Sequence, residues 1–137
     1  MRYMLDTNTV SNLLKGDPNV AQRIVAVPIT SLCISAIPEG ELLFGLAKRP
    51  SAERLHMAVS EFLRCADVLP WDSSVAKHYG TVRANLESQG KILSPLDLLI
   101  AVHALAVGAV LVTNDRAFGL VAKLALQDWT VQALGKP

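Results

Sequence analysis

The sequence has 137 residues and a mass of 14.7 kDa, with 51% apolar and 18% charged residues. This length and composition predict one packed domain over residues 1–137 and exclude disordered, collagen-like and coiled-coil chains. Thirteen basic and twelve acidic residues give a formal net charge of +1. Such a balance excludes a protein that binds nucleic acid mainly through its overall charge, so any such contact must come from a local patch.

Neither a membrane span nor a secretory signal is expected. The most apolar stretch, residues 98–112, is interrupted by His103 and Gly108 and is shorter than the roughly 20 residues of a membrane span. The first residues contain no apolar run typical of a secretory signal. Cys33 and Cys65 lie among apolar neighbours without metal-ligand spacing, so we expect two buried free thiols. These features predict a cytoplasmic protein.

Short apolar runs alternate with helical patterns in the first half of the chain. Gly16 is suited to end a first helix, and Asp17 followed by Pro18 is a typical start of a second. The expected elements are a strand at residues 2–5, helices at 9–15 and 18–25, a strand at 32–35, and helices at 38–48 and 51–64.

The second half continues the alternation. Asp72 or Ser73 can cap a helix that Gly90 ends, and the segment from Ser94 to Asp97 has the form of a capping box. The expected elements are a strand at 68–69, helices at 73–89 and 95–107, and strands at 109–113 and 129–132. Strands that alternate with helices predict an α/β protein, a three-layer α/β/α domain with a mainly parallel central sheet.

Four acidic residues lie where working groups gather in a parallel sheet, beyond the carboxyl ends of the strands. Asp6 closes the first strand, and Asp115 follows the strand at 109–113. Glu41 and Asp97 lie in the first turns of their helices. Each also has a plain structural interpretation, because Asp6 and Asp115 suit Asx turns and Asp97 suits a helix cap. Glu41 is the exception, with apolar neighbours and with Gly45 one turn further on.

If these carboxylates converge, the repulsion between their negative charges must be offset. Two unit charges 4 Å apart repel by about 4 kcal/mol at an effective dielectric constant of about 20. Carboxylates that meet therefore take up protons or bind a cation, and oxygen ligands favour Mg²⁺ or Mn²⁺ over zinc. Such ions commonly assist the attack of water on phosphate esters. His56, His78 and His103 lie on separate predicted helices, which disfavours histidine as general base.

Several short segments match a known family in order and spacing over nearly the whole chain. They are Met4-Leu5-Asp6-Thr7-Asn8, Ile34-Ser35-Ala36-Ile37, Glu41-Leu42-Leu43-Phe44-Gly45, Pro95-Leu96-Asp97-Leu98-Leu99-Ile100-Ala101, and Val112-Thr113-Asn114-Asp115 with Phe118. With these segments the chain resembles the PIN-domain ribonucleases, and more closely the VapC toxins of bacterial toxin–antitoxin pairs.

The resemblance implies a set of site residues. The acidic catalytic pocket would consist of Asp6, Glu41, Asp97 and Asp115, and the ligands of Mg²⁺ or Mn²⁺ would be Asp6, Asp97 and Asp115. Hydrogen bonds that orient carboxylates or water would come from Asn8, Thr113 and Asn114. Arg116, next to Asp115, is a candidate substrate contact.

One position departs from the family pattern. Pro38 stands where such toxins often have Thr, and Glu39 adds a second acid close to Glu41. We favour Glu41 because Gly45 completes the Glu-Leu-x-x-Gly pattern, and Glu39 is the alternative.

The resemblance implies a metal-dependent endoribonuclease that hydrolyses cellular RNA, either tRNA or rRNA, and is neutralised by a VapB-type antitoxin. That partner is expected to place a basic side chain in the acidic pocket and an apolar segment in a helix groove. A homodimer is expected through Leu42, Leu43, Phe44, Leu46, Leu55, Val59 and Phe62. Two alternatives stay open: a receiver-like phosphoacceptor module and a catalytically silent binding domain of the same fold.

Overall fold

The computed structural model describes residues 1–131. Its first half contains β1 (Tyr3–Leu5), α1 (Thr7–Leu14), α2 (Pro18–Val25), the 3₁₀ helix η1 (Ile29–Ser31), β2 (Leu32–Ser35), α3 (Ala36–Ala47) and α4 (Glu53–Cys65). Its second half contains β3 (Asp67–Leu69), α5 (Ser73–Ser88), α6 (Pro95–Val107), β4 (Val110–Val112), the 3₁₀ helix η2 (Arg116–Leu120) and β5 (Leu126–Gln127).

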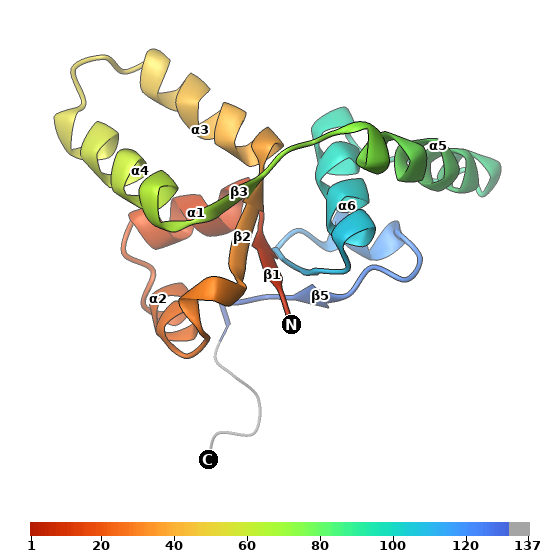
Figure 1. The fold of residues 1–137 in the computed structure, drawn as a ribbon, viewed down its shortest axis with the longest axis horizontal. Coiled ribbons are helices and arrows are strands. Elements are labelled where there is room, and N and C mark those ends of the chain that lie inside the picture. Colours follow the sequence, from red (N-terminus) through yellow and green to blue (C-terminus); the bar gives the residue numbers. More distant parts are fainter. Residues whose placement is uncertain (132–137) are drawn as a thin grey trace.

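The strands form one parallel sheet in the order β3-β2-β1-β4-β5. Helices α1 to α4 lie on one side of it, and α5 and α6 lie on the other (Figure 1). The carboxyl ends of β1, β2 and β4 therefore lie side by side at the same end of the sheet. The predicted three-layer α/β/α architecture with a parallel sheet is confirmed.

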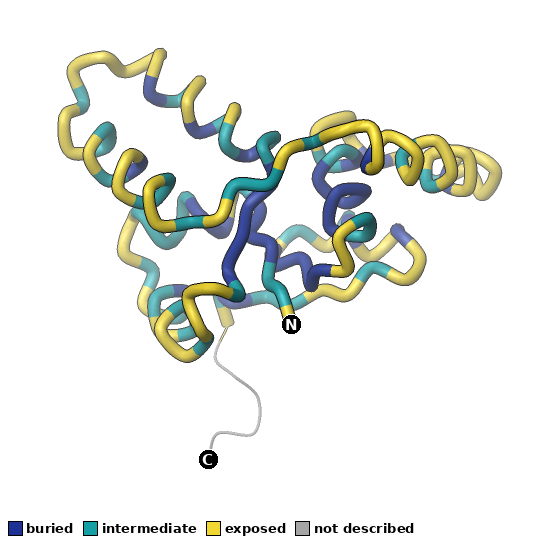
Figure 2. Tube along the Cα trace, viewed as in Figure 1, coloured by how far each residue is buried: buried dark blue, intermediate teal, exposed yellow. Residues whose placement is uncertain are grey.

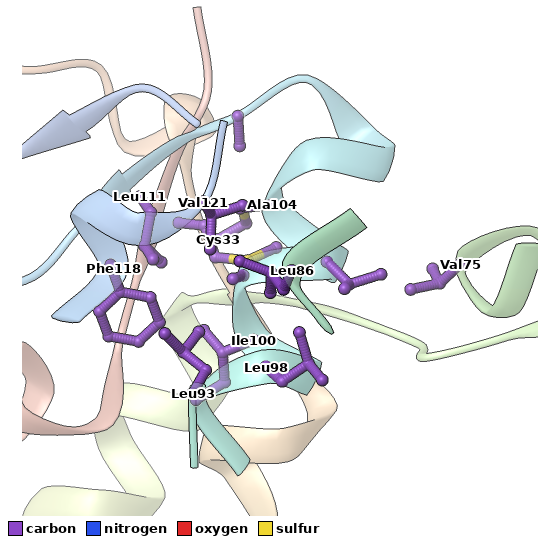
Figure 3. Packing of buried hydrophobic residues seen from close by; sticks show 14 residues of the cluster. Cys33, Val75, Leu86, Leu93, Leu98, Ile100, Ala104, Leu111, Phe118 and Val121 are labelled. Carbon is purple, nitrogen blue, oxygen red and sulfur yellow. The ribbon is translucent and has the colours of Figure 1, made fainter. Parts of the chain in front are cut away.

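Each face of the sheet has its own hydrophobic core. The α5 and α6 side is filled by residues such as Ile100, Leu111, Phe118 and Val121 (Figure 3). The other side is filled from β1, β2 and the helices α1 to α4. Burial is densest along the central strands and α6, whereas α5 is largely exposed (Figure 2). Among residues 1–131, no helix combines the length and apolar character needed to cross a bilayer.

Helix caps explain many of the boundaries. Asp17 Oδ1 accepts hydrogen bonds from the N–H groups of Asn19 at 2.9 Å and Val20 at 3.2 Å, and Pro18 begins α2 as predicted. Helix α6 begins after Ser94 and ends at Gly108, whose φ of 68° is a left-handed conformation that glycine tolerates well. This turn sends the chain directly into β4.

The structure corrects several predicted bounds: α3 begins at Ala36 rather than residue 38, because Ser35 is its N-cap, and α4 begins at Glu53 rather than residue 51. The first helix begins at Thr7 rather than residue 9, because Asp6 is its N-cap. The last strand is Leu126–Gln127, paired with β4, rather than residues 129–132. Trp129 is buried against Tyr3 instead, with ring centroids 5.3 Å apart, and residue 132 lies outside the described residues.

The two cysteines differ in environment. Cys33 is a buried free thiol in β2, as predicted, and burial raises the pKa of its thiol to about 11. Cys65 is exposed, which contradicts the prediction that both are buried. It lies six residues after buried Val59 on α4, which is about 240° around the helix at 100° per residue. Apolar neighbours in sequence therefore did not place it on the buried face.

Candidate active site at the carboxyl end of the sheet

Asp6 lies at the junction of β1, α1 and β4 and is only 4% exposed. Its Oδ1 atom accepts a hydrogen bond from the N–H of Thr9 at 2.8 Å, which caps α1. The hydroxyl of Thr9 donates to the carbonyl of Val112 at 2.9 Å. These two bonds attach the start of α1 to the end of β4 and fix the buried carboxylate between them.

The electrostatic environment of Asp6 links it to Asp97. Burial raises the pKa of Asp6, and the negative charge of Asp97 raises it further. The hydroxyl of Thr113, at the end of β4, favours the charged form and offsets part of this rise. Asp97 lies in the first turn of α6, where its N–H donates to Ser94 Oγ at 3.4 Å. The charge of Asp97, on the helix that covers the other face of the sheet, thus acts at Asp6.

Glu41 reaches the same region from α3. Its Oε1 atom accepts a hydrogen bond of 2.6 Å from the hydroxyl of Thr7, the residue after Asp6. Glu41 is half-buried one and a half turns into the helix, whereas Glu39 lies in the first turn. The bond to Thr7 favours Glu41 over Glu39 as the acid associated with Asp6.

Asp115 follows β4 by three residues and is held by its own loop. Its N–H donates to Thr113 Oγ1 at 3.0 Å, and its Oδ1 accepts from the N–H of Ala117 at 2.9 Å. Asp115 is therefore the cap of η2, as its Asx-turn interpretation predicted. Thr113 connects it to Asp6, because the same hydroxyl acts on both residues.

The other predicted residues are less constrained. Asn8, Asn114 and Arg116 are exposed. His56 and His78 bond to carbonyls of their own segments, those of Arg49 and Ser74. The sequence prediction omitted the roles of Thr7 and Thr9. Recognition of Asp6 as an N-cap could have found Thr9, whose N–H the cap accepts. The bond from Thr7 to Glu41 joins residues 34 positions apart and has no local signal.

A groove of about 240 Å³ begins beside Glu41 and runs between α1, α3 and α4. Its apolar lining comes from Leu14, Leu42, Leu46, Leu55 and Val59, and its basic lining from Lys15, Lys48 and Arg49. Thr7 and Gly45 also line it, so the groove is continuous with the acidic region. We refer to it below as the α1–α3–α4 groove.

Among residues 1–131, no three His, Cys, Asp or Glu side chains lie close enough together to enclose a metal ion. Asp6 and Asp97, the latter's charge acting on the former, are the carboxylates that could bind Mg²⁺, because this ion retains several water molecules and is usually bound through one or two carboxylates. Donors that are all oxygen atoms exclude a typical zinc site. The arrangement can hold a hard divalent cation that acts on a phosphate ester.

Acids at the carboxyl ends of a parallel α/β/α sheet lie where working residues gather in such folds. The model of the PIN domain matches residues 3–124, and the chain belongs to the PIN domain family. The tRNA(fMet)-specific endonuclease VapC of Shigella flexneri is 34% identical over 95% of this chain and 99% of its own length. Within the family, the chain is a VapC-type ribonuclease, and the receiver-like alternative is not favoured.

Solved structures agree with this assignment. DNA-bound VapBC from Salmonella typhimurium matches with a TM-score of 0.87 and 35% identity, over 94% of this chain and 98% of the other. VapBC2 from Rickettsia felis, bound to a DNA fragment from its promoter, matches with a TM-score of 0.86 and 31% identity, over 94% and 99%. Both relatives are toxin–antitoxin complexes.

Proposed function

We propose that the chain is a Mg²⁺- or Mn²⁺-dependent endoribonuclease toxin that acts in the cytoplasm under the control of an antitoxin. The observation that carries the proposal is the buried carboxylate of Asp6 together with the nearby charge of Asp97. A buried carboxylate whose pKa is raised mainly by burial, with another negative charge nearby, is typical of an active site.

Each acid has a proposed role. Asp6 and Asp97 would hold the metal directly, and Asp115 would reach it through one of the water molecules that Mg²⁺ retains. Glu41, held by Thr7, would accept a proton from the attacking water or orient that water. When bound, the metal would supply charge neutralisation for the phosphate and activation of water. Thr113, Asn8 and Asn114 would orient these groups, and Arg116 would contact the RNA backbone.

The metal requirement is tested with Asp97→Asn. Asn retains the size of Asp97 and removes the charge that a cation needs. Purified protein freed of any partner is expected to cleave RNA with Mg²⁺ or Mn²⁺ and to stop when a chelator is added. Asp97→Asn is expected to cleave at least about a hundredfold more slowly, because loss of a ligand exceeds the effect of losing an outer hydrogen-bond partner.

The matched control is Glu61→Gln, which removes a carboxylate from an exposed pair with Arg64 on α4. Exposed pairs contribute little to stability, so this variant is expected to keep wild-type cleavage. Circular dichroism checks that both variants are folded. Wild-type turnover by Asp97→Asn would leave this residue with a capping role alone and would contradict the proposal.

The substrate is proposed to be a structured RNA, with tRNA first, because the Shigella flexneri relative is a tRNA(fMet)-specific endonuclease. Expression of the protein without its partner, followed by sequencing of RNA 5′ ends, would identify the target. One recurrent cleavage site in a tRNA is expected. The same 5′ ends in cells that express Asp97→Asn would show that another enzyme makes the cuts.

The antitoxin is proposed to be a VapB-type protein that occupies the α1–α3–α4 groove and the acidic region together. Apolar residues of the groove would receive an apolar segment, and an Arg or Lys that follows it would pair with the carboxylates. Replacing the partner's basic residues near that segment by Ala is expected to weaken both binding and inhibition of cleavage. Unchanged affinity with unchanged inhibition would show that control is exerted elsewhere.

A further inference from the structure

A polar side chain lies in the middle of the core on the α6 side of the sheet. His103 is 0% exposed, and its neighbours on α6 include the buried residues Ala101, Val102 and Ala104. Its Nδ1 atom lies 2.7 Å from the hydroxyl of Ser35, whereas its Nε2 atom is buried with no hydrogen-bond partner among the described residues. A buried polar group without a partner is rare and costs stability. Such a residue calls for an explanation other than packing.

Ser35 occupies a junction in the fold. It is the last residue of β2 and the N-cap of α3, where its Oγ accepts a hydrogen bond of 3.1 Å from the N–H of Ile37. The side chain is 0% exposed. One hydroxyl group therefore contacts the start of α3 through Ile37 and the middle of α6 through His103.

The hydrogen-bond pattern favours one tautomer. If Ser35 donates its O–H to Nδ1, only the Nε2–H group of His103 is unpaired. If Nδ1–H donates instead, both the hydroxyl hydrogen of Ser35 and the Nε2 lone pair lack partners. The first arrangement satisfies more groups, so His103 accepts from Ser35 while Ser35 accepts from Ile37. Burial lowers the pKa of His103, which keeps the ring neutral in this role.

The junction lies at matched positions on the two helices that carry acids. His103 follows Asp97 by six residues on α6, and Glu41 follows Ser35 by six residues on α3. Six residues of helix span about 9 Å. The contact thus holds α3 and α6 together at a point that is six residues along each helix from its acid.

We propose that His103 is a positioning residue of the ribonuclease: by its hydrogen bond to Ser35 it fixes α6 against the start of α3 and so sets the placement of Asp97 relative to Glu41. This inference rests on the proposed function, which places both acids in the active site. Small displacements of reacting groups reduce rates strongly, because catalysis depends on placement. The stability lost at the unpaired Nε2 atom then results from keeping a polar contact at a position where an apolar side chain would pack.

The test compares His103→Leu with His103→Asn. Leu fills the core without a polar atom but leaves the hydroxyl hydrogen of Ser35 unpaired in place of Nε2–H, so the melting temperature is expected to be about unchanged. The kcat for RNA cleavage is expected to fall by about tenfold or more, with KM within about twofold, because outer hydrogen-bond partners typically contribute 10- to 100-fold. Asn can offer an acceptor oxygen to Ser35 and is expected to restore most of kcat while melting at a lower temperature.

A second readout does not depend on cleavage. Binding of Mn²⁺ alone, measured by calorimetry, is expected to be about tenfold weaker in His103→Leu than in the wild type. Ser35→Ala removes the same bond, so the double variant is expected to lose no more kcat than the more affected single variant.

The outcomes are separable. Unchanged kcat and Mn²⁺ affinity in His103→Leu, or independent losses in the double variant, would overturn the positioning role while the ribonuclease assignment stands. A melting temperature that falls together with kcat in His103→Leu, without rescue by Asn, would also overturn it, since packing alone explains that result. Wild-type cleavage by Asp97→Asn would overturn both proposals.

Discussion

Asp6 combines two roles with opposite effects on stability. As an N-cap it satisfies the N–H of Thr9 and stabilises α1, a contribution of about 1 kcal/mol for such caps. As a buried carboxylate near Asp97 it is costly when charged, and its pKa is raised mainly by burial. An amide would retain the capping oxygen without the charge. The residue is therefore a place where function and stability can be separated by one substitution.

We predict that Asp6→Asn melts at a higher temperature than the wild type at neutral pH in the presence of a chelator. Because the folded pKa of Asp6 is raised above its ordinary value of 3.8, protonation stabilises the native wild type. That contribution is complete below pH 3.8 and is lost as the pH rises through the folded pKa. The advantage of Asp6→Asn should therefore shrink on acidification, while cleavage is lost throughout. Thermal melts across the pH range measure this, and a lower melting temperature at neutral pH would contradict it.

Individual residues show what the sequence could and could not predict at the site. Asp6 and Asp115 were expected to have either a turn role or a site role, and both make capping bonds. The choice of Glu41 over Glu39 came from the motif, and the bond to Thr7 agrees with it. The contact between His103 and Ser35 joins residues 68 positions apart, so no local pattern predicts it.

At the level of elements, caps and breakers predicted most boundaries. Pro95 and Gly108 bracket α6 as expected, since each acts through its own backbone conformation. Strand β5 was missed because its two residues are defined by pairing with β4 and not by a local pattern. The strand order could likewise not be predicted from the sequence, because it depends on which distant strands pair. Local chemistry thus sets where most elements begin and end, and tertiary pairing sets the strand order and the short strand β5.

Helix α3 contains two glycines that offer a matched comparison. Gly40 and Gly45 both lie inside the helix, and apart from adjacent residues and the helix's own backbone no described atom lies within 4 Å of a Cβ placed at either. Each Gly→Ala change is expected to raise the free energy of unfolding by about 0.5–1 kcal/mol, as measured by urea denaturation. Only Gly45 lines the α1–α3–α4 groove, one turn from Glu41.

Gly45→Ala is therefore expected to weaken binding of the antitoxin, whereas Gly40→Ala is expected to leave it unchanged. The added methyl group occupies space in the groove at position 45 and faces solvent at position 40. Affinities measured by calorimetry with the purified partner decide this. Equal affinities for the two variants would mean that the partner does not reach this part of the groove.

For the whole molecule, the expected dimer surface needs revision. Leu42, Leu46 and Val59 were predicted to lie at the interface, but they are 8%, 8% and 1% exposed within one chain. The prediction counted only the sheet as a partner for these side chains, whereas α3 and α4 also pack on each other and bury them. Leu43 and Phe44 remain exposed on α3. An interface between two copies would therefore use the outer side of α3.

We predict that the free protein is a homodimer and that Phe44→Glu makes it monomeric. Phe44 is 63% exposed, and exposed apolar patches commonly mark interfaces, in which an unpaired carboxylate would be unfavourable. The matched control is Ile29→Glu, because Ile29 is 64% exposed but lies before β2, at the opposite end of the sheet from α3. It is expected to leave the dimer intact. Light scattering at micromolar concentration measures the mass of each protein. A monomeric wild type, or equal dissociation by the two substitutions, would show that α3 does not join two copies.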